Sequence, residues 1–367
     1  MQSKERILRA MRGEEVDRVP FCPFLTYWWE SQPDEFTSKG ELNFLESIEC
    51  DPLFRGHWPM TANNYEDMCI CKSIIKDCEI KTEFVNDKYK KVTYETTRGN
   101  LVLGYRYAEV SDSWFLTEYP VVEEEDFELL RYITENTTLV PNYERYDQVA
   151  AELGDRGLLL PLIHPEGKTA FQKMVEHWCG TENLIYALMD FPDTVRKTVD
   201  ALVNLSMEAA RIAAASNAEA FISWEDTSTT NISPELYREW ILPEINGWCD
   251  ILHASGKIYV QHACGHLKAL LKDIGNSKID VLESVTPIPI GDIEMQDVVD
   301  TLPEHIAVLG GLGAIQFLEH TEDQVEEDGR TLVKVMKGKR FLLANSDSCP
   351  PGISIEKFKR LAKVVRE

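Results

Sequence analysis

The chain has 367 residues, of which 44% are hydrophobic and 27% are charged, as in soluble globular proteins with one large α/β barrel or two ordinary domains. Its net charge of −24 repels phosphate backbones, so nucleic acid is not expected as a partner. No apolar run is long enough for a membrane span, and the nine cysteines, with no secretory signal, predict reduced thiols in the cytoplasm.

The N-terminal part begins with a charged amphipathic pattern, which predicts a helix within residues 1–20. A first strand is expected in DRVPFCPFL, followed by an aromatic loop, TYWWESQP. Residues 77–120 alternate polar and apolar side chains, with turn signals at Asn86-Asp87 and Arg98-Gly99-Asn100. This pattern predicts an antiparallel hairpin insertion.

From about residue 125, apolar runs alternate with amphipathic stretches, such as those at residues 234–255 and 321–337. Strands buried on both faces and separated by helices predict a parallel α/β fold. The number of runs favours a (β/α)8 TIM barrel spanning residues 1–367 as one domain, and a doubly wound sheet is the alternative. No G-x-G-x-x-G pattern follows any run, so a dinucleotide site is not expected. The runs are LLLPLI (158–163), EAFISW (219–224), KIYVQH (257–262), IDVLES (279–284), HIAVLG (305–310) and RFLLAN (340–345).

Side chains with catalytic or metal-binding chemistry follow several of these runs. Barrel enzymes carry their chemistry at the carboxyl ends of the strands, where such side chains converge. A mixed set of nitrogen, sulfur and oxygen donors suits zinc. Each residue also has a structural alternative, such as packing under a loop, a helix cap or an ion pair. The candidates are Glu225, Asp226, His262, Cys264, Glu283, Asp347 and Cys349.

Three stretches make the chain recognisable. The opening SKERILRAMRGEEVDRVPF, the middle ISPELYREWILPEINGWCDILHASGKIYVQHACGHLKALL and the end FLLANSDSCPPGISIEKFKRLAKVV resemble the uroporphyrinogen decarboxylase superfamily. The resemblance runs nearly end to end and is weakest across the hairpin insertion. It implies a (β/α)8 barrel with its site in the cleft at the carboxyl ends of the strands.

The superfamily has two main branches, and the sequence resembles one of them better. True decarboxylases carry an arginine-rich RQAGRY stretch that grips substrate carboxylates, whereas this chain has no arginine between Arg18 and Arg55. The zinc methyltransferases that work with corrinoid proteins carry His-x-Cys after a strand, a later cysteine and, in some members, a glutamate between them. This resemblance implies metal ligands at His262, Cys264 and Glu283. The later cysteine is expected at Ser346, so Cys349 is displaced by three positions and Asp347 is an alternative.

The resemblance thus implies a zinc-dependent methyltransferase that moves a methyl group between a small methylated substrate and the corrinoid of a partner protein. An aryl methyl ether is the favoured substrate, and Glu225 or Asp226 would orient it or act as acid or base. An aromatic stripe and one further histidine are the candidate pocket residues, with core packing as the alternative. A cofactor-free decarboxylase and a non-catalytic binding protein are the alternative functions. The candidate pocket residues are Tyr27, Trp28, Trp29, His57, Trp58 and His164.

Overall fold

The computed structural model describes residues 1–109 and 113–367 of the chain. These residues form two compact units. The first unit comprises Met1–Ile70, Asn142–Gly167 and Ala210–Glu367, and the second comprises Cys71–Pro141 and Lys168–Ala209. Within the described part of the chain, no helix is long and apolar enough to cross a membrane.

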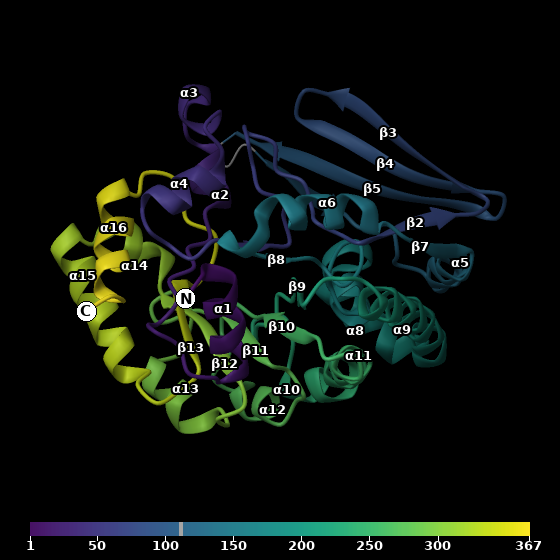
Figure 1. The fold of residues 1–367 in the computed structure, drawn as a ribbon. Helices are drawn as coiled ribbons and strands as arrows, with labels where there is room; N and C mark the ends of the chain where they lie inside the picture. The colour runs from purple at the N-terminus through teal and green to yellow at the C-terminus, as the bar shows by residue number, and fades with distance from the viewer. Residues whose placement is uncertain (110–112) are drawn as a thin grey trace. The chain divides into compact units, whose positions relative to one another are not determined.

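A parallel five-stranded sheet forms the centre of the first unit (Figure 1). Its strands lie in the spatial order β13-β12-β11-β10-β9, and each pairs in parallel with the next. All of their residues are buried, and every strand overlaps one of the apolar runs. The prediction of a parallel α/β fold is therefore confirmed. The strands are β9 (Ala220–Ser223), β10 (Ile258–His262), β11 (Val281–Val285), β12 (Ala307–Leu312) and β13 (Phe341–Asn345).

Two further parallel segments flank this sheet. β1 (Leu53–Arg55) pairs with β8 (Leu158–Leu160), and Leu162, just beyond β8, bridges to β9. At the other edge, Phe21 bridges to β13, so the expected first strand is present only as a single bridge. Over residues 1–109 and 113–367, the ladders do not close the strands into a ring. Barrel closure, like the single domain expected over the whole chain, stays a prediction.

An apolar cluster fills the interior of the first unit. Side chains alternate along a strand, so Val260 of β10 points into the cluster with Val281 of β11, whereas Gln261 points away from it. Two half-buried residues pack against this cluster: Val16, which follows α1, and Trp224, which follows β9. Val16 lies near the amino end of β13, and Trp224 lies at the carboxyl end of β9.

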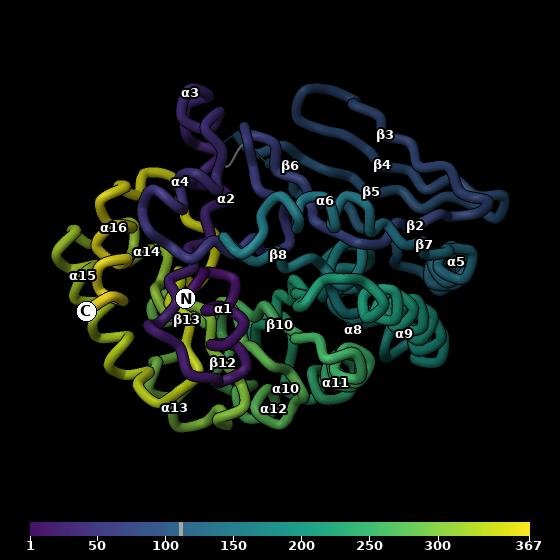
Figure 2. The backbone as a smooth tube through the Cα atoms, in the orientation of Figure 1, coloured from purple at the N-terminus to yellow at the C-terminus, as the bar shows by residue number. Residues whose placement is uncertain are grey.

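Helices pack around the strands of the first unit. α1 contacts β8, β12 and β13, and α15 and α16 lie side by side (Figure 1, Figure 2). The two expected amphipathic stretches are helical: residues 321–337 contain α15, and residues 234–255 form α10, a π-helical segment and α11. The helices are α1 (Ser3–Arg12), α2 (Thr26–Glu30), α3 (Asp34–Thr37), α4 (Glu41–Ser47), α6 (Tyr143–Leu153), α10 (Pro234–Leu236), α11 (Leu242–His253), α12 (Leu271–Gly275), α13 (Met295–Thr301), α14 (Ala314–Glu319), α15 (Glu322–Val335) and α16 (Ile355–Val364), with a 3-10 turn at Gly154–Arg156 and the π-helix at Tyr237–Ile241.

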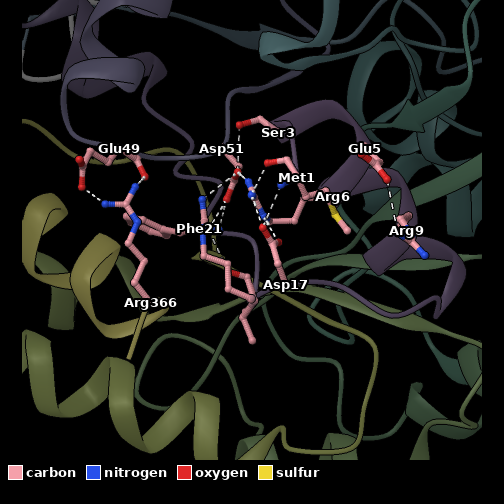
Figure 3. A network of polar contacts seen from close by, with 12 residues as sticks. Met1, Ser3, Glu5, Arg6, Arg9, Asp17, Phe21, Glu49, Asp51 and Arg366 are labelled. Carbon is pink, nitrogen blue, oxygen red and sulfur yellow. Dashed lines mark hydrogen bonds and ion pairs between the residues drawn. The ribbon is translucent and has the colours of Figure 1, made fainter.

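A buried carboxylate, Asp51, anchors α1 to the rest of the first unit (Figure 3). It accepts hydrogen bonds from the guanidinium of Arg6 at 2.5 Å, from that of Arg18 at 2.6 Å and from the backbone N–H of Phe21 at 3.0 Å. Arg6 also donates to Asp17 at 2.6 Å, so one arginine joins the helix to two segments. A buried charge requires such partners, because water cannot reach it.

One local expectation is wrong. The segment TYWWESQP forms α2 rather than a loop, because its indole rings pack into the core. After β10 the chain turns at Gly265 and α12 begins only at Leu271. Gly265 has φ +78°, and a Cβ there would lie 2.8 Å from Ser228 Oγ, so this tight turn needs a glycine.

The second unit contains the predicted antiparallel strands, extended to a four-stranded sheet in the order β3-β4-β5-β6. Both turn signals fall between paired strands, at the β3–β4 and β4–β5 connections. The strands are β3 (Cys78–Asn86), β4 (Tyr89–Thr96), β5 (Gly99–Ala108) and β6 (Ser113–Glu118), with a separate pair β2 (Cys71–Ile75) and β7 (Thr137–Pro141). The helices are α5 (Glu124–Glu135), α7 (Ala170–Lys173), a π-helix (Met174–Trp178), α8 (Gly180–Asp190) and most of α9 (Pro192–Ala215).

Candidate active site

The carboxyl ends of β9, β10 and β11 bring the main candidate residues together in the first unit. The register pairs His262 with Glu283 across β10 and β11, and it pairs Gln261 with Ser223 across β10 and β9. The residues that follow β9 therefore lie beside those that follow β10. Because neighbouring parallel strands end at the same edge of a sheet, side chains far apart in the sequence become neighbours.

A buried chain of polar contacts joins His262, Glu283 and Arg55. His262 Nδ1 lies 2.5 Å from Glu283 Oε2, and the other carboxylate oxygen accepts from Arg55 Nη1 at 2.5 Å. Glu283 and Arg55 are completely buried. Burial opposes the charged imidazole, but the charge of Glu283 and the hydrogen bonds of the imidazole with Cys264 and Glu283 raise the pKa of His262 well above its usual value. The arrangement fixes the orientation of the imidazole ring.

Cys264 extends this chain of contacts toward β9. Its thiol donates to Asp226 Oδ1 at 3.2 Å, and it also interacts with His262. Burial raises the pKa of the Cys264 thiol, while the hydrogen bond and charge of His262 lower it. Asp226, Cys264, His262 and Glu283 thus form one connected group.

The chemistry of this group fits a zinc ion in part. Imidazole nitrogen, thiol sulfur and carboxylate oxygen are the donors that zinc prefers, and His262 and Cys264 are close enough to interact. Glu283, however, is held by Arg55 through one oxygen and by His262 through the other. Among residues 1–109 and 113–367, no three His, Cys, Asp or Glu side chains are already gathered as a metal-binding group.

The expected fourth ligand, Cys349, follows β13 in the first unit. The Cys349 side chain is completely buried, and its backbone N–H donates to the carbonyl of Phe24 at 2.8 Å. Burial raises the pKa of this thiol well above its usual value; the Arg55 charge opposes that rise and the Asp347 charge adds to it. Asp347, the alternative ligand, is exposed, and its Oδ1 accepts from the Ser348 N–H at 2.6 Å. No polar contact of either residue with His262 or Cys264 is described, and the role of Cys349 or Asp347 as the fourth ligand stays a prediction.

Glu225 and Asp226 are adjacent in sequence but occupy different surroundings. Asp226 contacts Cys264, as described above. The side chain of Glu225 is completely buried, and its charge acts on the hydroxyls of Tyr237, in the π-helix, and Tyr259, in β10. Tyr259 points away from the apolar interior because it alternates with Val260. The expectation that one of these carboxylates orients substrate or acts as acid or base stays a prediction for both residues.

The aromatic residues predicted to line the pocket separate into two groups. Trp28 and Trp29 are buried and pack against Phe36 and Phe44. Because these rings are enclosed on all sides, their assignment to a substrate pocket is corrected to core packing. Tyr27, by contrast, is 60% exposed.

The remaining predicted pocket residues are buried and engaged in local contacts. His57 Nδ1 lies 3.0 Å from the Arg55 carbonyl, and Arg145 lies over the Trp58 ring at 4.3 Å. His164 packs its ring against Trp248 at 5.6 Å. These positions give each ring a structural role in the first unit, and their role in substrate binding stays a prediction.

Three site residues were missed by reasoning from the sequence. Arg55 is the buried partner of Glu283, and its guanidinium lies 4.8 Å from the centre of the Phe24 ring. Phe24 stacks on Trp224 with 5.6 Å between centroids, and Trp224 meets the His262 ring edge-on at 5.1 Å. The sequence contained a signal for Trp224, which ends the apolar run EAFISW, whereas the end of β1 at Arg55 is known only from the structure.

One solved structure and one family pattern agree with this fold. No curated protein matches the chain. Among solved structures, a methyltransferase from Methanosarcina mazei has a TM-score of 0.61 and 14% identity, over 99% of this chain and 98% of that one. A B12-independent methionine synthase from a Shewanella species has a TM-score of 0.46 and 9% identity, over 95% of this chain and 96% of that one. The pattern of the family described as Uroporphyrinogen decarboxylase (URO-D) matches residues 114–367, and the chain therefore belongs to that family.

Proposed function

We propose that the chain is a methyltransferase, which moves a methyl group between a small methylated compound and the corrinoid of a partner protein, with zinc bound at His262 and Cys264. The observation that carries this proposal is the connected group of Asp226, Cys264, His262 and Glu283 at adjacent strand ends. The likeness in fold to a methyltransferase over nearly the whole chain supports it. We also propose that the strands close into the (β/α)8 barrel.

His262 and Cys264 would hold the zinc, with a carboxylate from Glu283 or Asp226 as a further donor. Because Glu283 engages Nδ1 of His262, the Nε2 atom is the ring nitrogen left for a metal, the usual arrangement of a zinc-bound histidine with a carboxylate behind it. Zinc bound there would polarise the heteroatom that carries the methyl group, or would stabilise a thiolate acceptor.

The neighbouring residues would orient the His262 imidazole and accept the proton of the Cys264 thiol. Arg55 holds Glu283, and Glu283 holds His262, so the imidazole cannot rotate without breaking a buried ion pair. Cys264 must lose its proton to bind a metal, although burial raises the pKa of its thiol. Asp226 Oδ1, which accepts a hydrogen bond from Cys264 Sγ at 3.2 Å, is the nearest described acceptor for that proton.

Phe24 and Trp224 are proposed to line the substrate side of the site. Their rings stack with an interplanar angle of 15°, and Trp224 is half-buried beside His262. Flat aromatic walls favour a flat aryl ring, which supports an aryl methyl ether as the methyl donor. Two glycines make room for Trp224, since a Cβ at Gly56 or Gly167 would lie 2.6 Å or 3.3 Å from the indole.

The contacts of Arg55 favour methyl transfer over decarboxylation. A decarboxylase of this family needs cations for the carboxylates of its substrate. Arg55 is completely buried and its Nη1 is committed to Glu283. Its second terminal nitrogen donates to the carbonyl of Cys22. This engagement favours methyl transfer.

The proposal is tested by the metal content and methyl-transfer activity of the purified chain, prepared without chelators. We expect about one zinc per chain, lost in His262→Ala and Cys264→Ala, and the effect of Cys349→Ala decides whether Cys349 is a further ligand. Cys179→Ala is the matched control, since it removes a buried cysteine from the second unit. Activity is followed by the visible spectrum of cob(I)alamin as it becomes methylated by an aryl methyl ether.

Two results would overturn the proposal. Absence of zinc in the wild type would remove the metal-based mechanism. Retention of full methyl transfer in both His262→Ala and Cys264→Ala would place the chemistry elsewhere. Release of CO2 from a carboxylated substrate by the metal-free chain would instead establish the decarboxylase alternative.

A further inference from the structure

A cleft of about 780 Å³ opens in the first unit at the amino end of β13. We call it the amino-end cleft, and it lies at the opposite end of the strands from His262 and Cys264. Its walls come from the end of α1 and the segment after it, the end of α15 with the loop into β13, and the end of α16. Its volume falls within the range of about 300–1,000 Å³ that is typical of small-molecule sites.

The inner wall of the amino-end cleft is apolar. Val16, Val19 and Val333 are only partly buried, and Phe341 and Met336 complete the lining. Val16 also packs against the apolar interior of the first unit, so the cleft reaches the amino end of that interior. A partly exposed apolar wall inside a concave site is the feature that binds the apolar body of a ligand.

The charged lining of the amino-end cleft is basic, although the chain as a whole carries −24. It has five cationic side chains against two carboxylates, those of Glu14 and Glu367. The excess of cations raises the local concentration of anions and opposes the field of the acidic surface elsewhere. The cations are Arg330, Lys334, Lys337, Lys339 and Arg340.

Three of these cations hold the walls in place. Lys339 Nζ donates to the Leu302 carbonyl at 3.0 Å, Arg340 Nη1 donates to the His305 carbonyl at 2.9 Å, and Arg330 pairs with Glu326 and Glu367. Lys334 and Lys337 are different, because both are exposed and lie three residues apart at the end of α15. Two ammonium groups at the rim of a walled apolar cleft are suited to receive one anionic group.

We propose that the amino-end cleft binds a soluble amphipathic anion, with an apolar body about the size of one or two rings and a single carboxylate, sulfonate or phosphate. The apolar body contacts Val16, Val19, Val333 and Phe341, while Lys334 and Lys337 bind the anionic group. This site is independent of methyl transfer, because it lies at the other end of the strands.

The test uses the fluorescent probe 1-anilinonaphthalene-8-sulfonate with the zinc-loaded full chain. We expect saturable binding of about one probe per chain, weakened by about tenfold or more in the double variant Lys334→Glu/Lys337→Glu. The matched control Lys197→Glu/Lys359→Glu makes the same change of charge at exposed lysines outside the cleft and should bind as the wild type does. Neutral N-phenyl-1-naphthylamine should bind at least tenfold more weakly than the sulfonate.

Several results would overturn this inference. They are absence of saturable binding, equal binding of the charged and neutral probes, and equal weakening in the two double variants. Val333→Trp provides an independent check, since an indole there should fill the cleft and reduce probe binding with both lysines present. Urea unfolding of each variant shows whether it is folded, so that loss of binding is separated from loss of structure.

Discussion

The two ends of the strands in the first unit use charged residues in opposite ways. At the carboxyl ends, Arg55, Glu283 and His262 are buried and each bonds another member of the group. At the amino end of β13, Lys334 and Lys337 are exposed at the rim of an apolar cleft. Buried charges are stable only with fixed partners, whereas exposed charges remain free to meet a ligand. The first arrangement suits chemistry that needs fixed geometry, and the second suits reversible binding.

Removal of Arg55 tests the buried end most strongly and has the largest expected effect. Arg55→Met leaves Glu283 buried with His262 as its remaining polar partner, and the free energy of unfolding should fall by about 3–5 kcal/mol. Urea denaturation measures the change. The double variant Arg55→Met/Glu283→Gln should recover part of the loss, because it removes the uncompensated charge.

An exposed ion pair provides the control for Arg55. Lys278 pairs with Asp250 at 2.7 Å, and both side chains are more than half exposed. Lys278→Met should therefore lower the free energy of unfolding by less than about 1 kcal/mol. Equal losses of unfolding free energy in Arg55→Met and Lys278→Met would show that burial does not make the Arg55–Glu283 pair more important than an exposed ion pair.

Two glycines with similar backbone angles give the next largest effect. Gly56 has φ +68° and Gly13 has φ +73°, a backbone conformation that alanine adopts only with strain. Alanine at either position should therefore lower the free energy of unfolding by about 1–3 kcal/mol through the backbone alone. A Cβ at Gly56 would meet the Trp224 ring, which Phe24 holds in place, whereas one at Gly13 would meet the flexible Arg340 side chain. Gly56→Ala should therefore be the more destabilising, and it alone should change the near-ultraviolet circular dichroism of tryptophan. Equal destabilisation would contradict the rigid packing of Trp224.

A smaller effect is expected at the start of α15, which has Lys334 in its last turn and is followed by Lys337. The Thr321 hydroxyl accepts from the Gln324 N–H, and the Gln324 side chain accepts from the Thr321 N–H. Thr321→Ala should lower the free energy of unfolding by about 1 kcal/mol. Zinc content should not change, because α15 does not supply a residue to the candidate active site. A loss of zinc in this variant would mean that the two ends are coupled.

The smallest effect concerns pH and the anchor of α1. Hydrogen bonds from Arg6 hold the pKa of Asp17 well below its usual value, although burial opposes this (Figure 3). A carboxylate with a lowered pKa in the folded state stabilises it fully above its unfolded pKa of about 3.9, and this contribution is lost as the pH falls further. The stability difference between wild type and Asp17→Asn should thus be largest near pH 6 and shrink below about pH 4. A difference that does not vary with pH would contradict the role of the Asp17 charge.

Much of the fold could be predicted from local patterns. The six apolar runs become strands of the parallel architecture because burial on both faces leaves a continuous apolar signature. The alternation in residues 77–120 predicts the antiparallel sheet for a similar reason. The aromatic segment at residues 26–30 was misjudged as a loop, because the packing of its indoles against Phe36 and Phe44 is invisible in the local sequence.

The candidate site, too, was predictable only where local sequence patterns sufficed. The sequence by itself determined that His262, Cys264 and Glu283 stand at the carboxyl ends of neighbouring strands, since strand periodicity and chain order suffice for that. Only the tertiary structure decided that Arg55 pairs with Glu283, that Trp224 meets the His262 ring and that Trp28 and Trp29 pack in the core. Those contacts join residues far apart in the chain or depend on which face of a strand end a side chain occupies, and no local pattern encodes either.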